Sequence, residues 1–212
     1  MKVRSLNEFQ DAVDKETGWR KRELTTVLFD AQGARDSRRS TALRAGIALL
    51  YAHWEGWIKG VAESYIEHVA AQRLRYDELS NSFLALALQG KINEFSQTRQ
   101  PESYSQFINF LRSDLQERAR FGSSRSVVTE ANLSSSVLHK IIAGVGLEYG
   151  PYELLGTLID HSLLRRRNKI AHGEYLDLDL TEFELIYEEI TEALRAFTTD
   201  VLNSAATRAY RK

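Results

Sequence analysis

Three residues that can process a phosphodiester stand close together near position 170. Arg167, Asn168 and His172 belong to the run Arg-Asn-Lys-Ile-Ala-His, which begins at residue 167. Residues four apart share one face of a helix, so Asn168 lies beside His172, and the long side chain of Arg167 can curl over the same groove. An imidazole serves as a general base or acid near neutral pH, and a guanidinium stabilises phosphorane charge without titrating. This combination suits cleavage of RNA by its own 2′-hydroxyl, which needs no metal.

That reaction requires more groups than one copy of the run contains. A base must deprotonate the 2′-hydroxyl, an acid must protonate the leaving 5′-oxygen, and a cation must hold the phosphate. The run has one histidine, His172. A two-fold homodimer would place two copies face to face and supply both proton-transfer groups. We therefore expect a site shared between two chains, with RNA as the substrate.

The surrounding charges allow a second interpretation. Arg165, Arg166 and Lys169 add to a basic cluster beside His172. Residues 174–192 contain eight acidic residues and neither lysine nor arginine. The basic cluster suits RNA phosphates, but such a cluster is often a solvated helix face, and basic side chains near a helix end often serve the terminal carbonyls. The alternative is a non-catalytic helical interaction or regulatory module that binds a nucleotide, or a protein partner through the acidic segment.

Composition favours a helical globular protein. Only two prolines occur in 212 residues, so long helices can run unbroken. A hydrophobic content of 43% and a charged content of 27% are ordinary for a folded chain. The lack of cysteine excludes disulfides, thiolate metal sites and a cysteine nucleophile, and it fits a reducing cytosol. The N-terminus has no apolar leader run, and the hydrophobic stretch over residues 42–71 is interrupted by charges. We therefore expect a cytoplasmic protein without a membrane-spanning helix.

Hydrophobic periodicity predicts an all-α fold with long helices. A capping box of Ser5 and Glu8 begins the first helix, and a second box of Thr181 and Glu184 precedes the last one. Gly173 stands where helices commonly end in a left-handed residue. No linker divides the chain, so we expect one domain over residues 1–212. The expected helices span residues 6–31, 37–74, 77–95, 104–119, 134–145, 151–170 and 183–205.

The second of these helices contains a further candidate residue. Glu55 follows one tryptophan and precedes another by two positions, so its surroundings should be poor in water. A carboxylate there needs a partner. We expect Arg167 or His172 to be that partner, with Glu55 supporting the site. The alternative is a surface ion pair with Lys59, one turn further along.

No pattern predicts a metal ion or a cofactor. His68, His139 and His161 are scattered without the spacing of metal ligands, and no His-Glu-x-x-His motif occurs. Asp177 and Asp179 precede the last predicted helix, where a lone Asp-x-Asp is more often capping chemistry than a cation site. We therefore expect a reaction that uses protein side chains alone.

Three blocks of the sequence resemble a known superfamily. Residues 163–174, Leu-Leu-Arg-Arg-Arg-Asn-Lys-Ile-Ala-His-Gly-Glu, are similar to the signature of the HEPN superfamily, an Arg-x(4–6)-His motif that often has Asn directly after the Arg. Residues 49–60 resemble the upstream helix of the MAE-type, RiboL-PSP-HEPN-like branch. Residues 132–138 are similar to the segment that precedes the catalytic helix in that branch. The blocks lie in the expected order, and the resemblance covers roughly residues 35–200.

From the expected helices we anticipate long central helices and an additional helical insertion over about residues 77–150. The resemblance implies an all-α, HEPN-like helical bundle. It also implies a homodimeric, metal-independent endoribonuclease that leaves a 2′,3′-cyclic phosphate. Arg167 and His172 would take the catalytic roles, with Asn168 as a polar assistant. Many such proteins resemble toxins or phage-defence effectors, which adds an antitoxin or regulatory protein to the expected partners. Some superfamily members bind nucleotides or partners without cleaving RNA, so the fold alone does not fix the activity.

Overall fold

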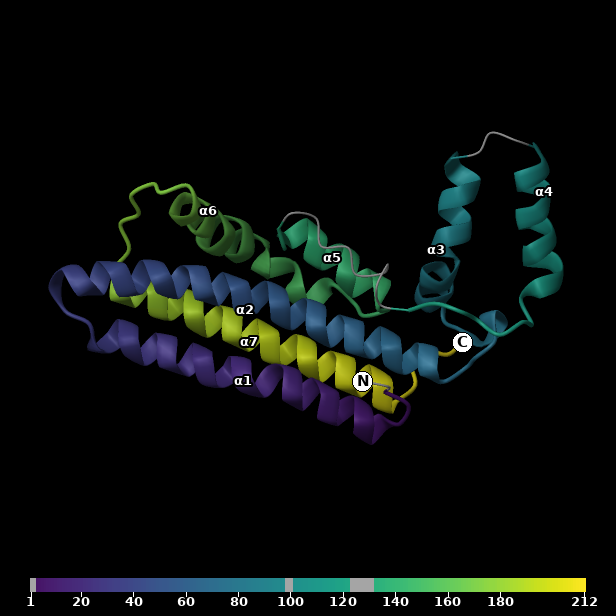
Figure 1. Cartoon of the computed structure of the whole chain (residues 1–212), viewed down its shortest axis with the longest axis horizontal. Helices are drawn as coiled ribbons and strands as arrows, with labels where there is room; N and C mark the ends of the chain where they lie inside the picture. The colour runs from purple at the N-terminus through teal and green to yellow at the C-terminus, as the bar shows by residue number, and fades with distance from the viewer. Residues whose placement is uncertain (1–2, 98–100, 123–131) are drawn as a thin grey trace.

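Three long helices form the body of the protein. The structure, a computed structural model, describes residues 3–97, 101–122 and 132–212. Helices α1 (Leu6–Gly33), α2 (Asp36–Ala71) and α7 (Leu180–Ala206) run side by side, and α2 contacts both of the others. The shorter α5 (Ser135–Gly144) and α6 (Arg165–Ala171) lie across one side of this body (Figure 1). The predicted all-α bundle with long central helices is confirmed.

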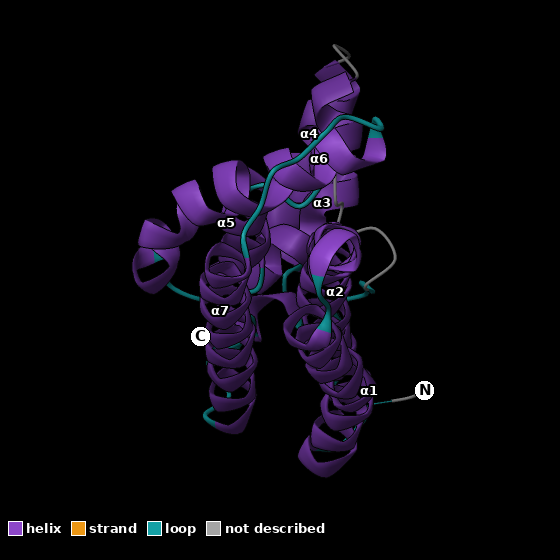
Figure 2. Ribbon diagram, turned by 90° about the vertical axis from the view of Figure 1, so that its left-hand side faces the viewer, coloured by secondary structure: helices purple, strands orange, loops and turns teal. Residues whose placement is uncertain are grey.

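Short helical segments connect these elements. They are η1 (Tyr76–Glu78), α3 (Asn81–Gln97), α4 (Pro101–Asn109), the π-helical η2 (Phe110–Asp114), η4 (Gly150–Leu155) and the π-helical η5 (Leu158–Leu164), which runs directly into α6. Figure 2 shows helices and loops throughout. In the described part of the chain, extended pairing is limited to two isolated bridges, Arg75 with Arg118 and Leu79 with Arg211.

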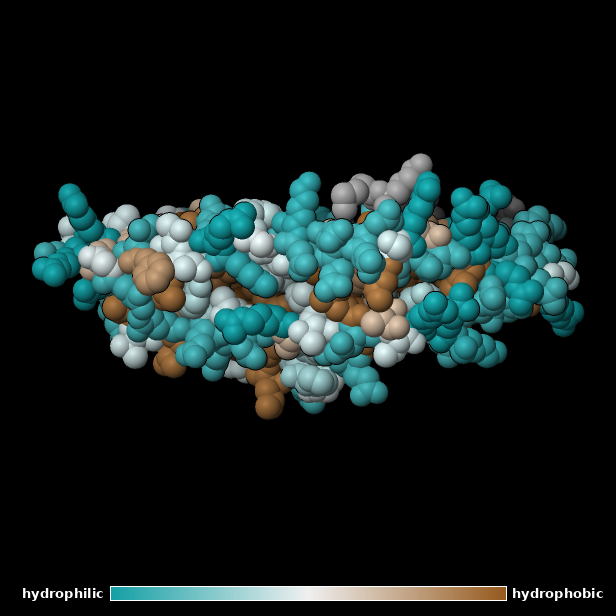
Figure 3. Space-filling model, turned by 90° about the horizontal axis from the view of Figure 1, so that it is seen from below, coloured by the Kyte–Doolittle hydropathy of each residue, from teal (hydrophilic) through white to brown (hydrophobic). Residues whose placement is uncertain are grey.

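Helix α2 lies at the centre of the core, where it packs against α1, α6 and α7 and buries a broad face along its length. Leu50, Trp54, Ile58, Val61 and Tyr65 are all completely buried. This helix corresponds to the one that the sequence predicts over residues 37–74, and it is one of the long central helices. Seen from the side on which α1 and α7 lie, the surface is mostly hydrophilic and hydrophobic residues show in a narrow band (Figure 3). None of the described helices combines the length and apolarity that crossing a bilayer would require.

The two capping boxes predicted from the sequence have different outcomes. The Ser5 hydroxyl accepts from the Glu8 N–H at 3.1 Å and the Glu8 carboxylate accepts from the Ser5 N–H at 3.0 Å, so the first capping box is confirmed. The second predicted box is wrong. Helix α7 begins at Leu180, because the Asp179 carboxylate accepts from the Glu182 N–H at 2.8 Å and caps it. Thr181 therefore lies inside the helix.

The third and fourth helices have different bounds from those predicted, because main-chain hydrogen bonds join the segments beside them. The residues after η2 leave the helix and accept hydrogen bonds from the segment after α2. The Asp77 N–H donates to the Leu115 carbonyl at 2.9 Å, and the Tyr76 N–H donates to the Glu117 carbonyl at 3.1 Å. The fourth helix therefore stops short of residue 119, and the third begins only at Asn81. The stretch between the predicted helices 104–119 and 134–145 falls largely outside the described residues.

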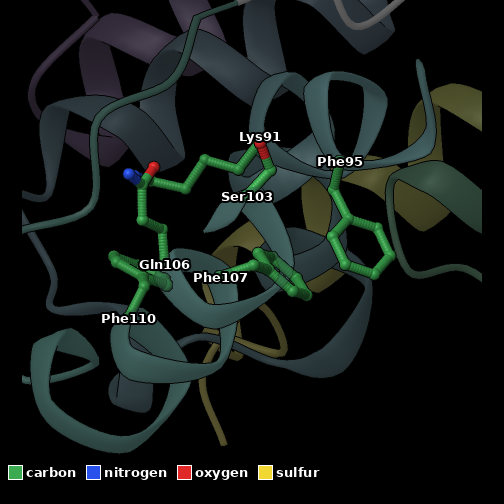
Figure 4. Close-up of a pocket in the computed structure, with 6 residues that line it drawn as sticks. All are labelled: Lys91, Phe95, Ser103, Gln106, Phe107 and Phe110. Carbon is green, nitrogen blue, oxygen red and sulfur yellow. The ribbon is translucent and has the colours of Figure 1, made fainter. Parts of the chain in front are cut away.

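The segment expected as an insertion, residues 77–150, takes two different forms. Helices α3 and α4 project from the bundle as a hairpin (Figure 1). Between them, the ring centroids of Phe95 and Phe107 are 5.0 Å apart and the Lys91 ammonium lies 4.4 Å from the Phe110 ring. Figure 4 shows these side chains around a small hollow, together with Ser103 and Gln106. Helix α5 instead returns to the bundle, so an insertion with these bounds would combine a projecting hairpin and a packed helix.

Helices α2 and α7 approach closely at Gly46. A Cβ added to Gly46 would lie 2.8 Å from the ring of Phe183, which is completely buried. Because a packed interior gives way only at a cost, we expect Gly46→Ala to destabilise the protein by about 1–3 kcal/mol in urea unfolding. Gly90→Ala is the matched control, since its Cβ would meet nothing within 4 Å and a helical alanine gains about 1 kcal/mol. Equal effects of the two changes would contradict close packing at Gly46.

Candidate functional site

Helix α6 carries the Arg-Asn-Lys-Ile-Ala-His run and ends as the sequence predicts. His172 is its C-terminal cap, and Gly173 follows with φ +74°, in the left-handed region. The Glu174 N–H donates to the Lys169 carbonyl at 2.9 Å, and the Gly173 N–H donates to the next carbonyl along at 3.1 Å. These two bonds form a Schellman motif, which fixes the turn. The His172 side chain is exposed at this end of the helix.

Arg167 is held by two contacts from distant parts of the chain. Its guanidinium lies over the Tyr51 ring of α2, with the Cζ atom 3.9 Å from the ring centroid. One terminal nitrogen donates a hydrogen bond to the Asn132 side-chain oxygen. A guanidinium stacked on an aromatic face gains about 0.5–2 kcal/mol and loses rotational freedom. We call Tyr51, Asn132 and Arg167 the arginine clamp.

The clamp is in turn anchored to the core of α2. The Leu133 N–H donates to the Tyr51 hydroxyl at 2.8 Å, and the Trp54 indole N–H donates to the Leu133 carbonyl at 3.3 Å. Leu133 and Trp54 are completely buried. The main chain next to Asn132 therefore has both of its polar groups satisfied by side chains of one helix. This arrangement sets the position of the Asn132 amide that accepts from Arg167.

The Tyr51 hydroxyl serves the clamp as a neutral group. Burial raises the pKa of Tyr51 above its ordinary value, opposed by the Leu133 N–H and the Arg167 guanidinium, while the Glu55 carboxylate raises it further. Glu55 is half-buried one turn along α2 and influences the clamp through Tyr51. In the described residues it is within ion-pair distance of neither the predicted partners, Arg167 and His172, nor Lys59.

The other polar residues of α6 have different surroundings. Arg166 forms an ion pair with Glu182 of α7, and its side chain is 19% exposed. Arg165 is exposed, while Asn168 and Lys169 are half-buried. Within the described residues, no ion pair engages Arg165 or Lys169. Three cations were predicted to contact RNA. Arg166 is the one that already forms an ion pair within the chain.

The predictions from sequence identified the helix end but not the clamp. Tyr51 and Asn132 both fall within blocks that resemble the HEPN-like branch, yet neither was singled out. Their signal in the sequence is weak, because a tyrosine in a core helix and an asparagine before a helix are ordinary. Across the described residues, no cluster of three or more His, Asp or Glu side chains has the arrangement of a metal site.

Comparison with known families adds to this geometry. The sequence model of the RiboL-PSP-HEPN family matches residues 15–203. The matched region contains the whole clamp and His172, together with all the helices that position them. No curated protein sequence and no solved structure matches the chain.

Proposed function

The chain belongs to the RiboL-PSP-HEPN family of the HEPN superfamily, and we propose that it is a metal-independent endoribonuclease whose site is shared by two copies of the chain. The family suggests a nuclease or another RNA-related role. The observation that carries the finer proposal is the arginine clamp. It fixes the Arg167 guanidinium on the helix whose C-terminal cap, five residues further along, is the exposed His172. A held cation and a solvent-accessible imidazole therefore belong to the same short helix.

In the proposed reaction, the 2′-oxygen of a ribose attacks the adjacent phosphorus and the bond from phosphorus to the 5′-oxygen breaks. One copy of His172 takes the 2′-hydroxyl proton, and the second copy, protonated, gives a proton to the leaving 5′-oxygen. Arg167 stabilises the charge that develops on the non-bridging oxygens. Asn168 assists as a neutral donor, and Arg165 and Lys169 attract the RNA backbone. The products are a 2′,3′-cyclic phosphate and a 5′-hydroxyl.

A biological role follows from the family resemblance. We propose that cleavage serves a toxin or phage-defence function in the cytoplasm, with an antitoxin or regulatory protein as a further partner. The proposed reaction needs a second imidazole. In the described residues no hydrogen bond or ring contact joins His172 to another histidine, and His172 is exposed, so a second copy of the chain can bring its own His172 to it.

Incubation of the purified protein with single-stranded RNA tests the chemistry. We expect fragments with 2′,3′-cyclic phosphate and 5′-hydroxyl ends, formed at an unchanged rate in excess EDTA, because no step uses a metal. End-group analysis by phosphatase and kinase treatment distinguishes these ends from 3′-hydroxyl and 5′-phosphate products. Loss of cleavage on chelation would contradict the mechanism. RNA or protein binding without cleavage of any substrate would favour the non-catalytic module.

Asn132→Ala tests the positioning role of the clamp. It removes the acceptor for the Arg167 guanidinium but leaves the Tyr51 ring in place. Misplacement of a catalytic group by about 1 Å costs up to about 10²-fold, so we expect kcat to fall about 10–100-fold. Asn132→Asp, which keeps an acceptor, should retain more activity than alanine. Because Asn132 is half-buried, the melting temperature should change little, and a fall in activity that merely follows unfolding would argue against positioning.

A further inference from the structure

A groove lies between helix α7 and the segment that leads into α6. Residues of η4 and η5 form one wall, and the first half of α7 forms the other. Its volume is about 640 Å³. The side chains that act on RNA in the proposed function do not line it. Arg167 lies over the Tyr51 ring of α2, whereas the lining residues belong to η4, η5 and α7. The groove therefore requires its own explanation.

The walls of the groove are apolar. Leu154 is 93% exposed and Leu185 is 57% exposed, and Leu155 and Leu158 are partly buried beside them. Small side chains of α7, including Ala193, leave room between the walls. Folding leaves most of the Leu154 side chain and more than half of the Leu185 side chain in water, so covering them by a partner would be favourable.

One rim of the groove is acidic. Glu188, Glu189 and Glu192 follow one another along α7, and all are exposed. Among the described residues, Glu188 and Glu189 have no ion-pair partner. Glu192 contacts Arg195 at 3.3 Å, but both side chains are more than 60% exposed and such surface pairs contribute little. The rim thus repels phosphate and attracts cations.

We propose that this groove binds an amphipathic helix of a protein partner, with leucine-like anchors on one face and lysine or arginine flanking them. The apolar walls suit anchors repeated at i, i+3, i+4 and i+7, as in other helix-in-groove contacts. The acidic rim selects the sign of the flanking charge. A two-fold contact with a second copy of this chain is disfavoured, because it would bring the Glu188–Glu192 rows of the two copies together.

Fluorescence anisotropy with designed peptides tests the proposal independently of RNA cleavage. The probe is an 18-residue peptide with leucines at helical spacing and lysines beside them. The controls are the same peptide with glutamate in place of lysine and a scrambled peptide of identical composition. At about 0.15 M salt, where charges beyond about 8 Å are screened, we expect both controls to bind at least tenfold more weakly than the probe.

Matched variants place the binding in the groove. Leu185→Ser should weaken binding of the lysine peptide at least tenfold, and so should the double change Glu188→Lys with Glu189→Lys. The double change should also strengthen binding of the glutamate peptide. Two control variants change α1 instead. Phe29→Ser replaces an exposed apolar residue, and the double change Asp11→Lys with Asp14→Lys alters the net charge by the same amount as the groove variant. Both should leave peptide binding unchanged. Equal binding of the lysine peptide to the wild-type protein and to the groove variants would overturn the proposal. So would a change in the sedimentation mass of the chain alone in Leu185→Ser, which would assign the groove to a contact between copies.

Discussion

His172→Ala is expected to lower RNA cleavage by at least about 10²–10⁴-fold, the usual contribution of one positioned general acid or base, because a dimer of the variant loses both the acid and the base. The loss should appear in kcat, because the imidazole acts on protons in the transition state and, in the described residues, takes part in no hydrogen bond, ion pair or ring contact within the chain. The variant should fold normally, since His172 is exposed and the turn after α6 depends on main-chain bonds and on Gly173. Wild-type activity in this variant would contradict the proposed chemistry.

Arg167 provides the companion test. Arg167→Ala removes the charge that the proposed mechanism places on the phosphate and should cost about 10²–10³-fold in kcat. Arg167→Lys keeps a charge but loses the planar group that stacks on Tyr51 while it donates to Asn132. We therefore expect the lysine variant to recover only a small part of the activity. Full rescue by lysine would show that charge alone is needed and that the clamp has no positioning role.

Mixed dimers distinguish a shared site from two independent ones. Wild-type and His172→Ala chains are mixed in equal amounts and allowed to exchange. If each cleavage event needs both copies of His172, only wild-type dimers are active and about a quarter of the wild-type rate remains, from random pairing in a two-fold dimer. If each chain acts alone, about half remains. Light scattering of the same samples establishes that dimers are present.

The sequence predicted those features that depend on neighbouring residues. The Ser5 cap, the end of α6 at Gly173 and the central place of α2 each follow from a few adjacent side chains or from one periodic pattern. The position of Arg167 along the chain was likewise clear. Its orientation was not, because it depends on an oxygen 35 residues away and on a ring in another helix. Contacts of that kind arise from the packing of α2 against α6, which periodicity does not describe.

The charges of α6 show the same limit. In sequence, Arg165, Arg166 and Arg167 are three equivalent cations beside a histidine. Successive residues on a helix point about 100° apart, so the fold sends them to different surroundings. Arg167 reaches α2, Arg166 pairs with Glu182 of α7, and Arg165 remains in solvent. A basic cluster read from sequence therefore overstates the charge that is free to meet RNA.

Trp54→Ala is expected to have the largest effect on stability. Trp54 is completely buried in α2, and truncation of such a residue costs about 3–5 kcal/mol, a large share of the total stability of a typical domain. The indole N–H also donates to the Leu133 carbonyl, so the change leaves a buried acceptor unpaired. Urea unfolding measures the cost. Trp19→Ala is the control, because Trp19 is 43% exposed and its contacts, with the Arg20 guanidinium and the edge of the His53 ring, should each contribute about 1 kcal/mol or less.

Trp54→Phe separates the packing role of this residue from its hydrogen bond. Phenylalanine fills most of the space, so the loss of stability should be smaller than with alanine, about 1–3 kcal/mol, and due largely to the unpaired Leu133 carbonyl. That carbonyl belongs to Leu133, the residue after Asn132. A more mobile main chain there should also weaken the hydrogen bond that positions Arg167. We therefore expect Trp54→Phe to lower RNA cleavage at temperatures where the variant is fully folded. Unchanged cleavage in a destabilised Trp54→Phe protein would separate the core of α2 from the clamp, and the position of Arg167 would then depend on Tyr51 and Asn132 alone.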